Sequence, residues 1–283
     1  MSLLSMFQRV CNEVGLPEPT LIVTSTDRQV KQLLATTYRV GNDVKCADWN
    51  KLEREATITL VDGQENYALP ADYDVELSET EWDSTNDWPL IGPLSPSEWQ
   101  ALKNNTISSS EFERKFRIKG TALKTFYIDP VPDSTNAGDV LLFEYLSQNW
   151  IRPKTWTTAT VFTAGSYCFY DGVYFSTVAG GTTGATAPTT LVPNDGGVVW
   201  VVSTAVYSFT ADTDEFILDE DLIGLGVQWN YLASKGLPYM HLEKKYNNDI
   251  SYLMAQNAGT ETVSLVPKHG LYNSGYRNYR VVP

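Results

Sequence analysis

The chain has 283 residues, of which 42% are hydrophobic and 19% are charged, and this composition is typical of a folded protein rather than a disordered one. Its formal net charge is −13, which excludes a protein that binds DNA through a basic surface spread over the whole chain. No apolar run approaches the ~18 residues of a membrane-spanning helix, and the first residues lack the basic start and cleavage site of a signal peptide.

The cysteines and histidines suggest neither a disulfide framework nor a metal site. Cys11, Cys46 and Cys168 are far apart and odd in number, so we expect free thiols and folding in the reducing cytoplasm of a host cell. His241 and His269 have no partner at metal-ligand spacing. We therefore predict no metal and no cofactor.

The first part of the chain predicts helices. Apolar residues recur at helical spacing over 2–15, and Gly15 followed by Pro17 gives a stop signal. A second helix is expected over 27–40, ending at Gly41. A third is expected after Asp48, with Trp49, Leu52 and Ala56 on one face.

From residue 58 the periodicity changes to that of strands. Strand, turn and strand are predicted around Asp62-Gly63, and further strands over 75–82 and 140–145. A short helix should start at Pro96, and a hairpin should turn at Lys119-Gly120.

Between residues 153 and 207 the composition shifts to Thr, Ala, Gly and Val, with dense aromatic residues and only three charges. Short strand-like runs separated by glycine turns predict a small all-β module inserted into a host domain. Beyond it, helices are expected from Asp219 to Lys235 and from Tyr239 to Asn257. Residues 260–283 have no periodicity and predict an extended arm.

These elements predict an α+β protein: a helical bundle, a β-hairpin or small-sheet region, an inserted all-β domain and an extended C-terminal arm. The predicted division is 1–152 and 208–259 for the body, 153–207 for the inserted module and 260–283 for the arm.

The order of these elements, together with the segment Tyr67-x-Leu69-Pro70-x-Asp72-Tyr73, resembles the head-to-tail adaptors of short-tailed bacteriophages, also called tail accessory or head-completion proteins. The resemblance covers roughly 1–152 and 207–283. It implies a structural virion protein at the head–tail junction and not an enzyme. The implied assembly is a homo-oligomer, a dodecameric ring on the portal protein, that also contacts a tail tube or nozzle protein. DNA would pass through its channel during ejection without specific binding, and no membrane would be involved.

The arm is the predicted portal-binding segment, because tyrosine and arginine are favoured anchors at protein interfaces. The alternative is a terminus without a partner. The residues expected to bind the portal are Tyr272, Tyr276, Arg277, Tyr279 and Arg280.

The module at 153–207 resembles small carbohydrate-binding modules of the chitin-binding kind. Flat aromatic rings can stack on sugar rings, which predicts a glycan-binding protein as the alternative function. The competing interpretation is that a module this small needs its aromatic residues for its own core. The candidate glycan-binding residues are Trp156, Tyr167, Tyr174 and Trp200.

Acidic residues cluster in two places, but neither cluster predicts catalysis. Eleven Asp or Glu and no Lys or Arg lie between Glu55 and Leu102, which suits either the wall of a DNA channel or a solvated surface. Pairs such as Asp72 with Asp74, or Asp212 with Asp214, were the candidates for a carboxylate hydrolase or a calcium loop. Nothing in the sequence places such a pair across a cleft, so we predict no catalytic residues.

Overall fold

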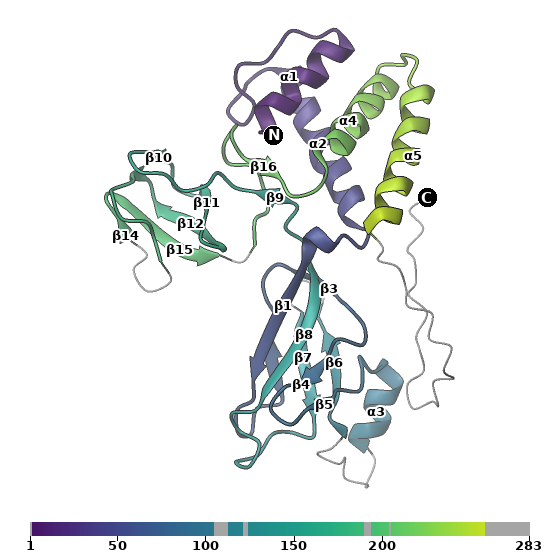
Figure 1. Ribbon diagram of the computed structural model, residues 1–283, viewed down its shortest axis with the longest axis vertical. Helices are drawn as coiled ribbons and strands as arrows, with labels where there is room; N and C mark the ends of the chain where they lie inside the picture. Colours follow the sequence, from purple (N-terminus) through teal and green to yellow (C-terminus); the bar gives the residue numbers. More distant parts are fainter. Residues whose placement is uncertain (1, 105–112, 121–123, 190–193, 204, 258–283) are drawn as a thin grey trace.

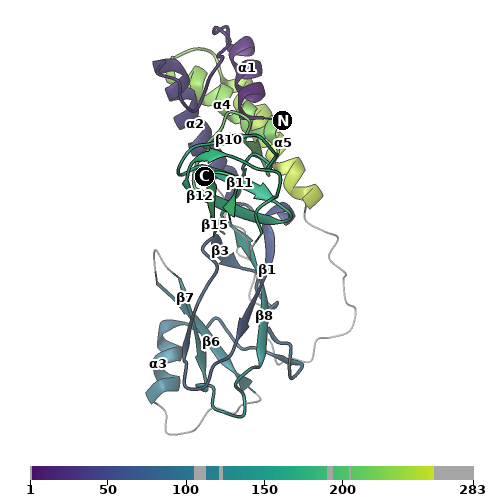
Figure 2. The same cartoon turned by 90° about the vertical axis from the view of Figure 1, so that its left-hand side faces the viewer.

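The computed structural model describes residues 2–104, 113–120, 124–189, 194–203 and 205–257. These residues form five helices and several small antiparallel sheets, so the predicted α+β class is confirmed. Three parts meet at one junction (Figure 1): a body of helices, a β region at the opposite end, and a smaller β module to the side. A perpendicular view shows the helical body and the β region stacked along the long axis (Figure 2).

The helical body consists of α1 (Leu3–Val14), α2 (Arg28–Lys45), α4 (Glu220–Ser234) and α5 (Met240–Asn257). Ser2 caps α1 at its start, and Gly15, with φ of 71°, ends it as predicted. α4 is the central helix, because it contacts the other three and is buried on most sides. Gly226 permits this close packing, since a Cβ there would lie 2.5 Å from Val40 Cγ1.

The second helix does not end at Gly41, and that prediction was wrong. α2 continues to Lys45, and Gly41 is buried within it. A Cβ at position 41 would lie 2.4 Å from Cη2 of the Trp150 ring. Glycine is therefore needed here for the approach of an aromatic ring, and the helix tolerates it in its interior.

Trp150 belongs to an aromatic cluster at the junction of the three parts. Its ring stacks on Phe216 and meets Phe209 edge-on, with centroid distances of 6.2 and 5.6 Å. The backbone N–H of Phe209 donates to Tyr38 Oη at 2.8 Å, which ties this cluster to α2. Two short strands, β9 (Ile151–Arg152) and β16 (Glu215–Phe216), pair beside it.

Gly41→Ala is expected to destabilise the protein by about 1–3 kcal/mol, because the new methyl group must displace the Trp150 ring. This loss exceeds the ~1 kcal/mol that alanine gains in helix propensity. Urea unfolding followed by tryptophan fluorescence measures the change. Gly197→Ala is the matched control, since a Cβ there meets nothing closer than 3.9 Å. Equal unfolding midpoints for the two variants would contradict the proposed clash.

The β region covers residues 53–147 and is connected to the junction at both ends. A five-stranded sheet has the order β1-β8-β4-β5 with β3 also paired to β8, and a three-stranded sheet has the order β2-β7-β6. Stacked rings of Phe116, Phe126 and Phe143 fill the core shared by the two sheets. The elements are β1 (Glu53–Thr59), β2 (Asn66–Ala68), β3 (Tyr73–Glu76), β4 (Trp82–Asp83), β5 (Trp88–Pro89), α3 (Pro96–Asn104), β6 (Lys115–Lys119), β7 (Thr125–Asp129) and β8 (Val140–Ser147).

Two predictions for this region were wrong, and four were confirmed. The helix expected after Asp48 is only one 3₁₀ turn, Asn50–Leu52, and Ala56 lies in β1. The single strand expected over 75–82 is instead two strands, β3 and β4, separated by a turn. The strands on either side of Asp62-Gly63 are present as predicted, although β1 pairs with β8 and β2 with β7 rather than with each other. The helix at Pro96, the β6–β7 hairpin and the strand over 140–145 are present as expected.

Several acidic residues between Glu55 and Leu102 are structural. Asp83 is fully buried, and its Oδ2 lies 2.6 Å from Arg114 Nη1. Arg114 Nη2 also donates to Asp139 at 2.7 Å. Asp72 accepts hydrogen bonds from Tyr145 and Ser147. The acidic stretch is therefore not one continuous exposed wall.

Glu81 is 4% exposed, and burial raises the pKa of its carboxyl to about 7. Hydrogen bonds from the backbone N–H groups of residues 79–81 lower this pKa but do not cancel the effect of burial. Because the folded-state pKa lies above the unfolded one, the neutral carboxyl stabilises the fold at low pH, and this contribution is lost as pH rises through about 7.

Glu81→Gln is therefore expected to flatten the pH dependence of stability. Relative to the unchanged protein, the free energy of unfolding of the variant should be more favourable at pH ~8 than at pH ~5 by roughly 2–3 kcal/mol. The free energy of unfolding in urea at the two pH values tests this. The exposed neighbour Glu79, changed to Gln, is the control. The same pH dependence in Glu81→Gln and in the unchanged protein would overturn the assignment.

The β module lies between β9 and β16 in the chain and is built from two small sheets. β11 (Tyr167–Tyr170), β12 (Val173–Ala179), β15 (Val198–Ser203) and β14 (Asn194–Asp195) form the larger one in that order, and β10 (Val161–Phe162) pairs with β13 (Gly181–Thr182). Phe162, Cys168, Phe175 and Trp200 form its core. The all-β character of this segment is thus observed in its described residues, while the division into domains at 153 and 207 stays a prediction.

Candidate interaction surfaces

The five residues predicted to bind the portal, Tyr272, Tyr276, Arg277, Tyr279 and Arg280, lie outside the described residues. The structure therefore does not test this part of the prediction. The last described residue, Asn257, ends α5 beside the start of the β region. Asn257 Oδ1 accepts from the N–H of Asn50 at 3.0 Å, and its Nδ2 donates to the carbonyl of Asp48. The end of α5 is thus fixed at the junction.

The four candidate glycan-binding residues fall on two different faces of the β module. Trp200 is 1% exposed and meets Phe162 edge-on at 4.9 Å. Trp156 packs against the same core and meets the ring of Tyr170 at 5.5 Å. These two residues therefore serve the core of the module, and the ring of Trp200 is not accessible to a sugar.

Tyr167 and Tyr174 lie on the other face and attach the module to the helical body. Both pack against the core of that body. The N–H of Tyr167 donates to Thr210 Oγ1 at 3.2 Å, and Phe169 between them carries Arg152 over its ring at 4.9 Å. The structure does not bring the four aromatic residues together, so their placement favours packing, and glycan binding stays an untested prediction.

Of the carboxylates considered for catalysis or calcium binding, Asp212 and Asp214 accept backbone hydrogen bonds, whereas Asp72 accepts from side-chain hydroxyls and Asp74 pairs with Lys45. Asp214 is 1% exposed and accepts N–H groups of Lys154, Thr210 and Ala211 at 2.7–2.9 Å. Burial raises the pKa of its carboxyl, and these N–H groups oppose that rise. Asp212 accepts the N–H groups of residues 22 and 23. Both residues fasten loops to the junction, a role that the sequence alone did not reveal.

Among the described residues, no three His, Cys, Asp or Glu side chains lie together as a metal site would require. The three cysteines are free thiols, two of them buried. In the part of the chain that the structure describes, no helix has the length and apolarity needed to cross a membrane.

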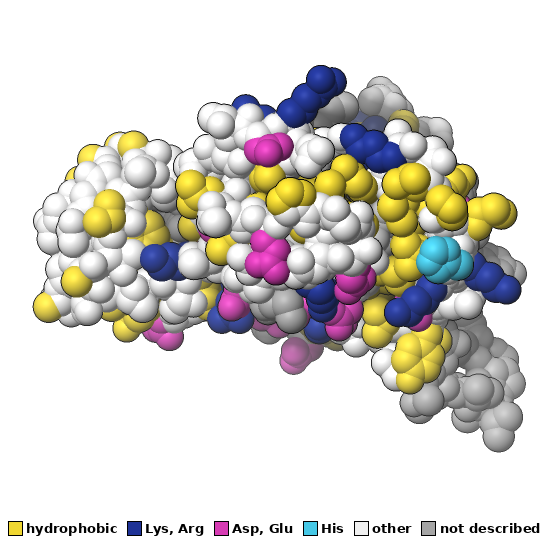
Figure 3. All heavy atoms as spheres, turned by 90° about the horizontal axis from the view of Figure 1, so that it is seen from above, with side chains coloured by type: hydrophobic (Ala, Val, Ile, Leu, Met, Phe, Trp, Pro, Cys, Tyr) yellow, Lys and Arg dark blue, Asp and Glu magenta, His cyan; other side chains and the backbone are white. Residues whose placement is uncertain are grey.

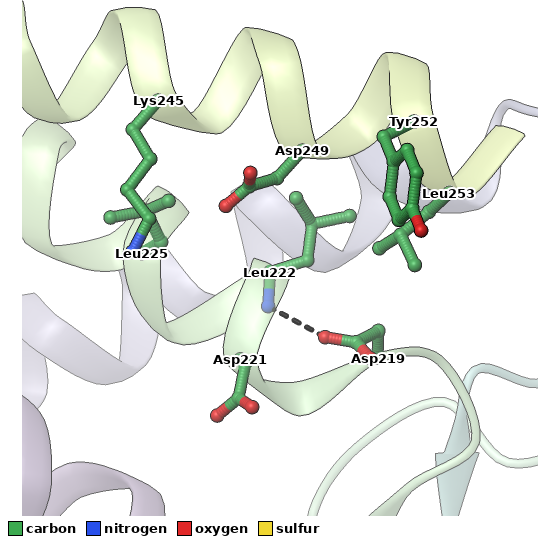
Figure 4. A pocket seen from close by; sticks show the side chains of 8 residues that line it. All are labelled: Asp219, Asp221, Leu222, Leu225, Lys245, Asp249, Tyr252 and Leu253. Carbon is green, nitrogen blue, oxygen red and sulfur yellow. Dashed lines mark hydrogen bonds between the residues drawn. The ribbon is translucent and has the colours of Figure 1, made fainter.

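A shallow cavity of about 220 Å³ lies between the start of α4 and the middle of α5 (Figure 4). Leu222, Leu225 and Leu253 give it an apolar lining, and Asp249 and Lys245 project into it from α5. Asp219 at its edge caps α4 by accepting from the N–H of Leu222 at 2.9 Å. One of the acidic residues here, Asp219, thus serves as a helix cap.

The end of the helical body away from the β region exposes apolar side chains (Figure 3). Met240 is 75% exposed and Leu237 48% exposed, at the connection between α4 and α5. Lys, Arg, Asp and Glu side chains also lie on this face (Figure 3). An exposed apolar patch surrounded by polar side chains is a typical feature of a protein-binding surface.

The helical body, the β region and the β module make this an α+β protein that presents separate faces from three connected parts. The family model of the SU10 adaptor protein matches residues 1–174. Because that is more than half of the chain, the protein belongs to the SU10 adaptor protein family, which is a family of structural bacteriophage proteins and not of enzymes. No curated protein matches the chain. The matched region contains α1, α2 and the β region and ends within β12.

Proposed function

We propose that this protein is the head-to-tail adaptor of a short-tailed bacteriophage, located in the virion between the portal protein and the tail. The observation that carries the proposal is the SU10 adaptor match over residues 1–174. In this role several copies form a ring below the portal, and the tail tube or nozzle binds the ring from the other side.

The shape of the molecule supports a connecting role. The helical body and the β region lie at opposite ends of the long axis, so one copy can contact two different partners (Figure 2). The apolar patch at Leu237 and Met240 suits a protein partner at the helical end. In a ring, each copy contacts its two neighbouring copies through two different surfaces. The three-part outline of the molecule offers such different surfaces.

The charge of the chain suits a channel that DNA passes without being held. At a net charge of −13 per copy, the ring repels phosphate overall. Passage of DNA during ejection is therefore part of the proposed role, and specific DNA binding is not.

Native mass spectrometry of the purified chain, alone and mixed with the portal ring of its source virus, tests this function. We expect the chain to load onto the portal in a fixed ratio, one copy for each portal subunit. The absence of any complex, with a folded chain and an intact portal ring, would overturn the adaptor function.

A further inference from the structure

The five-stranded sheet has one face with exposed side chains, although at the junction end of this face Leu146 is 6% exposed and packs into the core of the helical body. The inner face of the sheet carries Ile58, Leu141 and Phe143 into the core. The side chains that alternate with them point outward, and we call this surface the outer sheet face. Cross-strand pairs place its members in rows: Glu53, Leu146 and Val75, then Glu55 and Glu144, then Thr57, Leu142 and Trp82.

The outer sheet face combines apolar and acidic side chains. Val75 is 46% exposed and Trp82 39% exposed, both large residues for an open surface. Glu55 lies directly opposite Glu144 in the β1–β8 pair, and both are exposed. Among the described residues, neither makes an ion pair with Lys, Arg or His. Two like charges in directly opposed positions destabilise a sheet unless a cation lies between them.

One edge of the same sheet is also open. β1 pairs with β8 on one side, and no described strand pairs with its other side. Its seven residues keep a regular register with no bulge and contain no proline. The backbone groups along this edge are free to bind an extended segment.

The chain itself supplies a segment of matching chemistry at the right place. Residues 258–283 follow Asn257, which is hydrogen-bonded to Asn50, three residues before β1. The last part, 267–283, contains Lys268, Arg277 and Arg280 and no acidic residue. An extended chain spans about 3.3–3.6 Å per residue, so the nine residues between Asn257 and residue 267 reach ~30 Å. The whole outer sheet face lies within that reach, because β1 rises only ~3.3 Å per residue over seven residues.

We propose that in the free protein the C-terminal segment 267–283 docks on the outer sheet face of its own chain. Its basic side chains lie between Glu55 and Glu144, and its tyrosines cover Val75 and Trp82. This contact goes beyond the adaptor function, because it holds the arm on its own subunit until another partner displaces it. Docking on the sheet does not require a portal, so the two proposals can fail separately.

Limited trypsin digestion of the full-length chain tests the proposal, because trypsin cuts after Lys268, Arg277 and Arg280. Intact-mass spectrometry follows the loss of the C-terminal fragments at low protease concentration. We expect cleavage after Arg277 and Arg280 to be about tenfold slower than in a synthetic peptide of residues 260–283. The double variant Glu55→Gln/Glu144→Gln should restore the rate seen in the peptide.

A matched variant removes two exposed acids elsewhere, Asp62→Asn/Asp171→Asn, and should keep the protection. Cleavage of the unchanged chain at the peptide rate overturns the proposal. Equal protection in both double variants also overturns it. Protection that appears only at high protein concentration overturns docking on the same chain, because it shows that the segment binds a second copy. Portal loading measured in parallel reports on the adaptor function independently.

Discussion

Removing residues 260–283 is expected to abolish binding to the portal ring while the folded body remains intact. The arm contains the predicted anchors Tyr272, Tyr276 and Arg277, and loss of a central Tyr or Arg anchor typically costs ~2 kcal/mol or more. Loss of two such anchors corresponds to a decrease of at least ~1000-fold in affinity. Sedimentation or native mass spectrometry with the portal ring measures this change.

The control for this experiment is a full-length chain with the order of residues 260–283 scrambled. It keeps the charge and length of the arm but moves the tyrosines and arginines, so it should fail to bind as well. Normal binding by the truncated chain would end the hypothesis that the arm is the portal anchor. Binding by the scrambled chain alone would mean that charge, and not the position of the anchors, is what the portal recognises.

The helices could be predicted from the sequence because their signals are local. Ser2 and Gly15 bound α1, and Asp219 caps α4, as the residue types indicate. Gly41 misled the prediction because a helix stop and a glycine that admits a ring look alike in one sequence. Only the position of Trp150, more than a hundred residues away, distinguishes them.

The β region shows what local patterns miss. The alternation near Asp62-Gly63 correctly indicates strands, but their partners β8 and β7 lie far along the chain, so a turn between them does not make a hairpin. Trp49, Leu52 and Ala56 have helical spacing, but they do not share a helix. Trp49 and Leu52 are buried in the core of the helical body, and Ala56 lies in β1. Tertiary context overrides a pattern of three residues.

For the candidate sites too, the sequence shows which residues are present, but only the fold decides where they lie. The aromatic residues of the β module could be found in the sequence, but the face on which each would lie could not. Strand register decides it: Trp200 points into the module, and Tyr174 on the neighbouring strand points toward the helical body. Asp214 can be recognised as an acid in the sequence, but one of its three backbone partners, Lys154, lies 60 residues away along the chain.

Arg114 pairs with the buried Asp83 and the partly buried Asp139 in the β region, and replacing it should have the largest effect on stability. Its side chain is 5% exposed, with Asp83 at 0% and Asp139 at 15%. Asn136 Oδ1 also accepts from Arg114 Nη2 at 3.3 Å. Because Asp83 is far from water, removal of the cation leaves a buried carboxylate without its counter-charge.

Arg114→Met is therefore expected to lower the free energy of unfolding by about 3–5 kcal/mol. Arg117→Met in β6, three residues further along the chain, is the matched control and should cost less than ~1 kcal/mol, since Arg117 makes no ion pair with the described residues. Urea unfolding monitored by circular dichroism compares the two. A triple variant that also changes Asp83 and Asp139 to Asn should recover much of the loss, because no buried charge then remains unpaired. If Arg114→Met and Arg117→Met unfold at the same urea concentration, the buried cluster is not a main determinant of the stability of the β region.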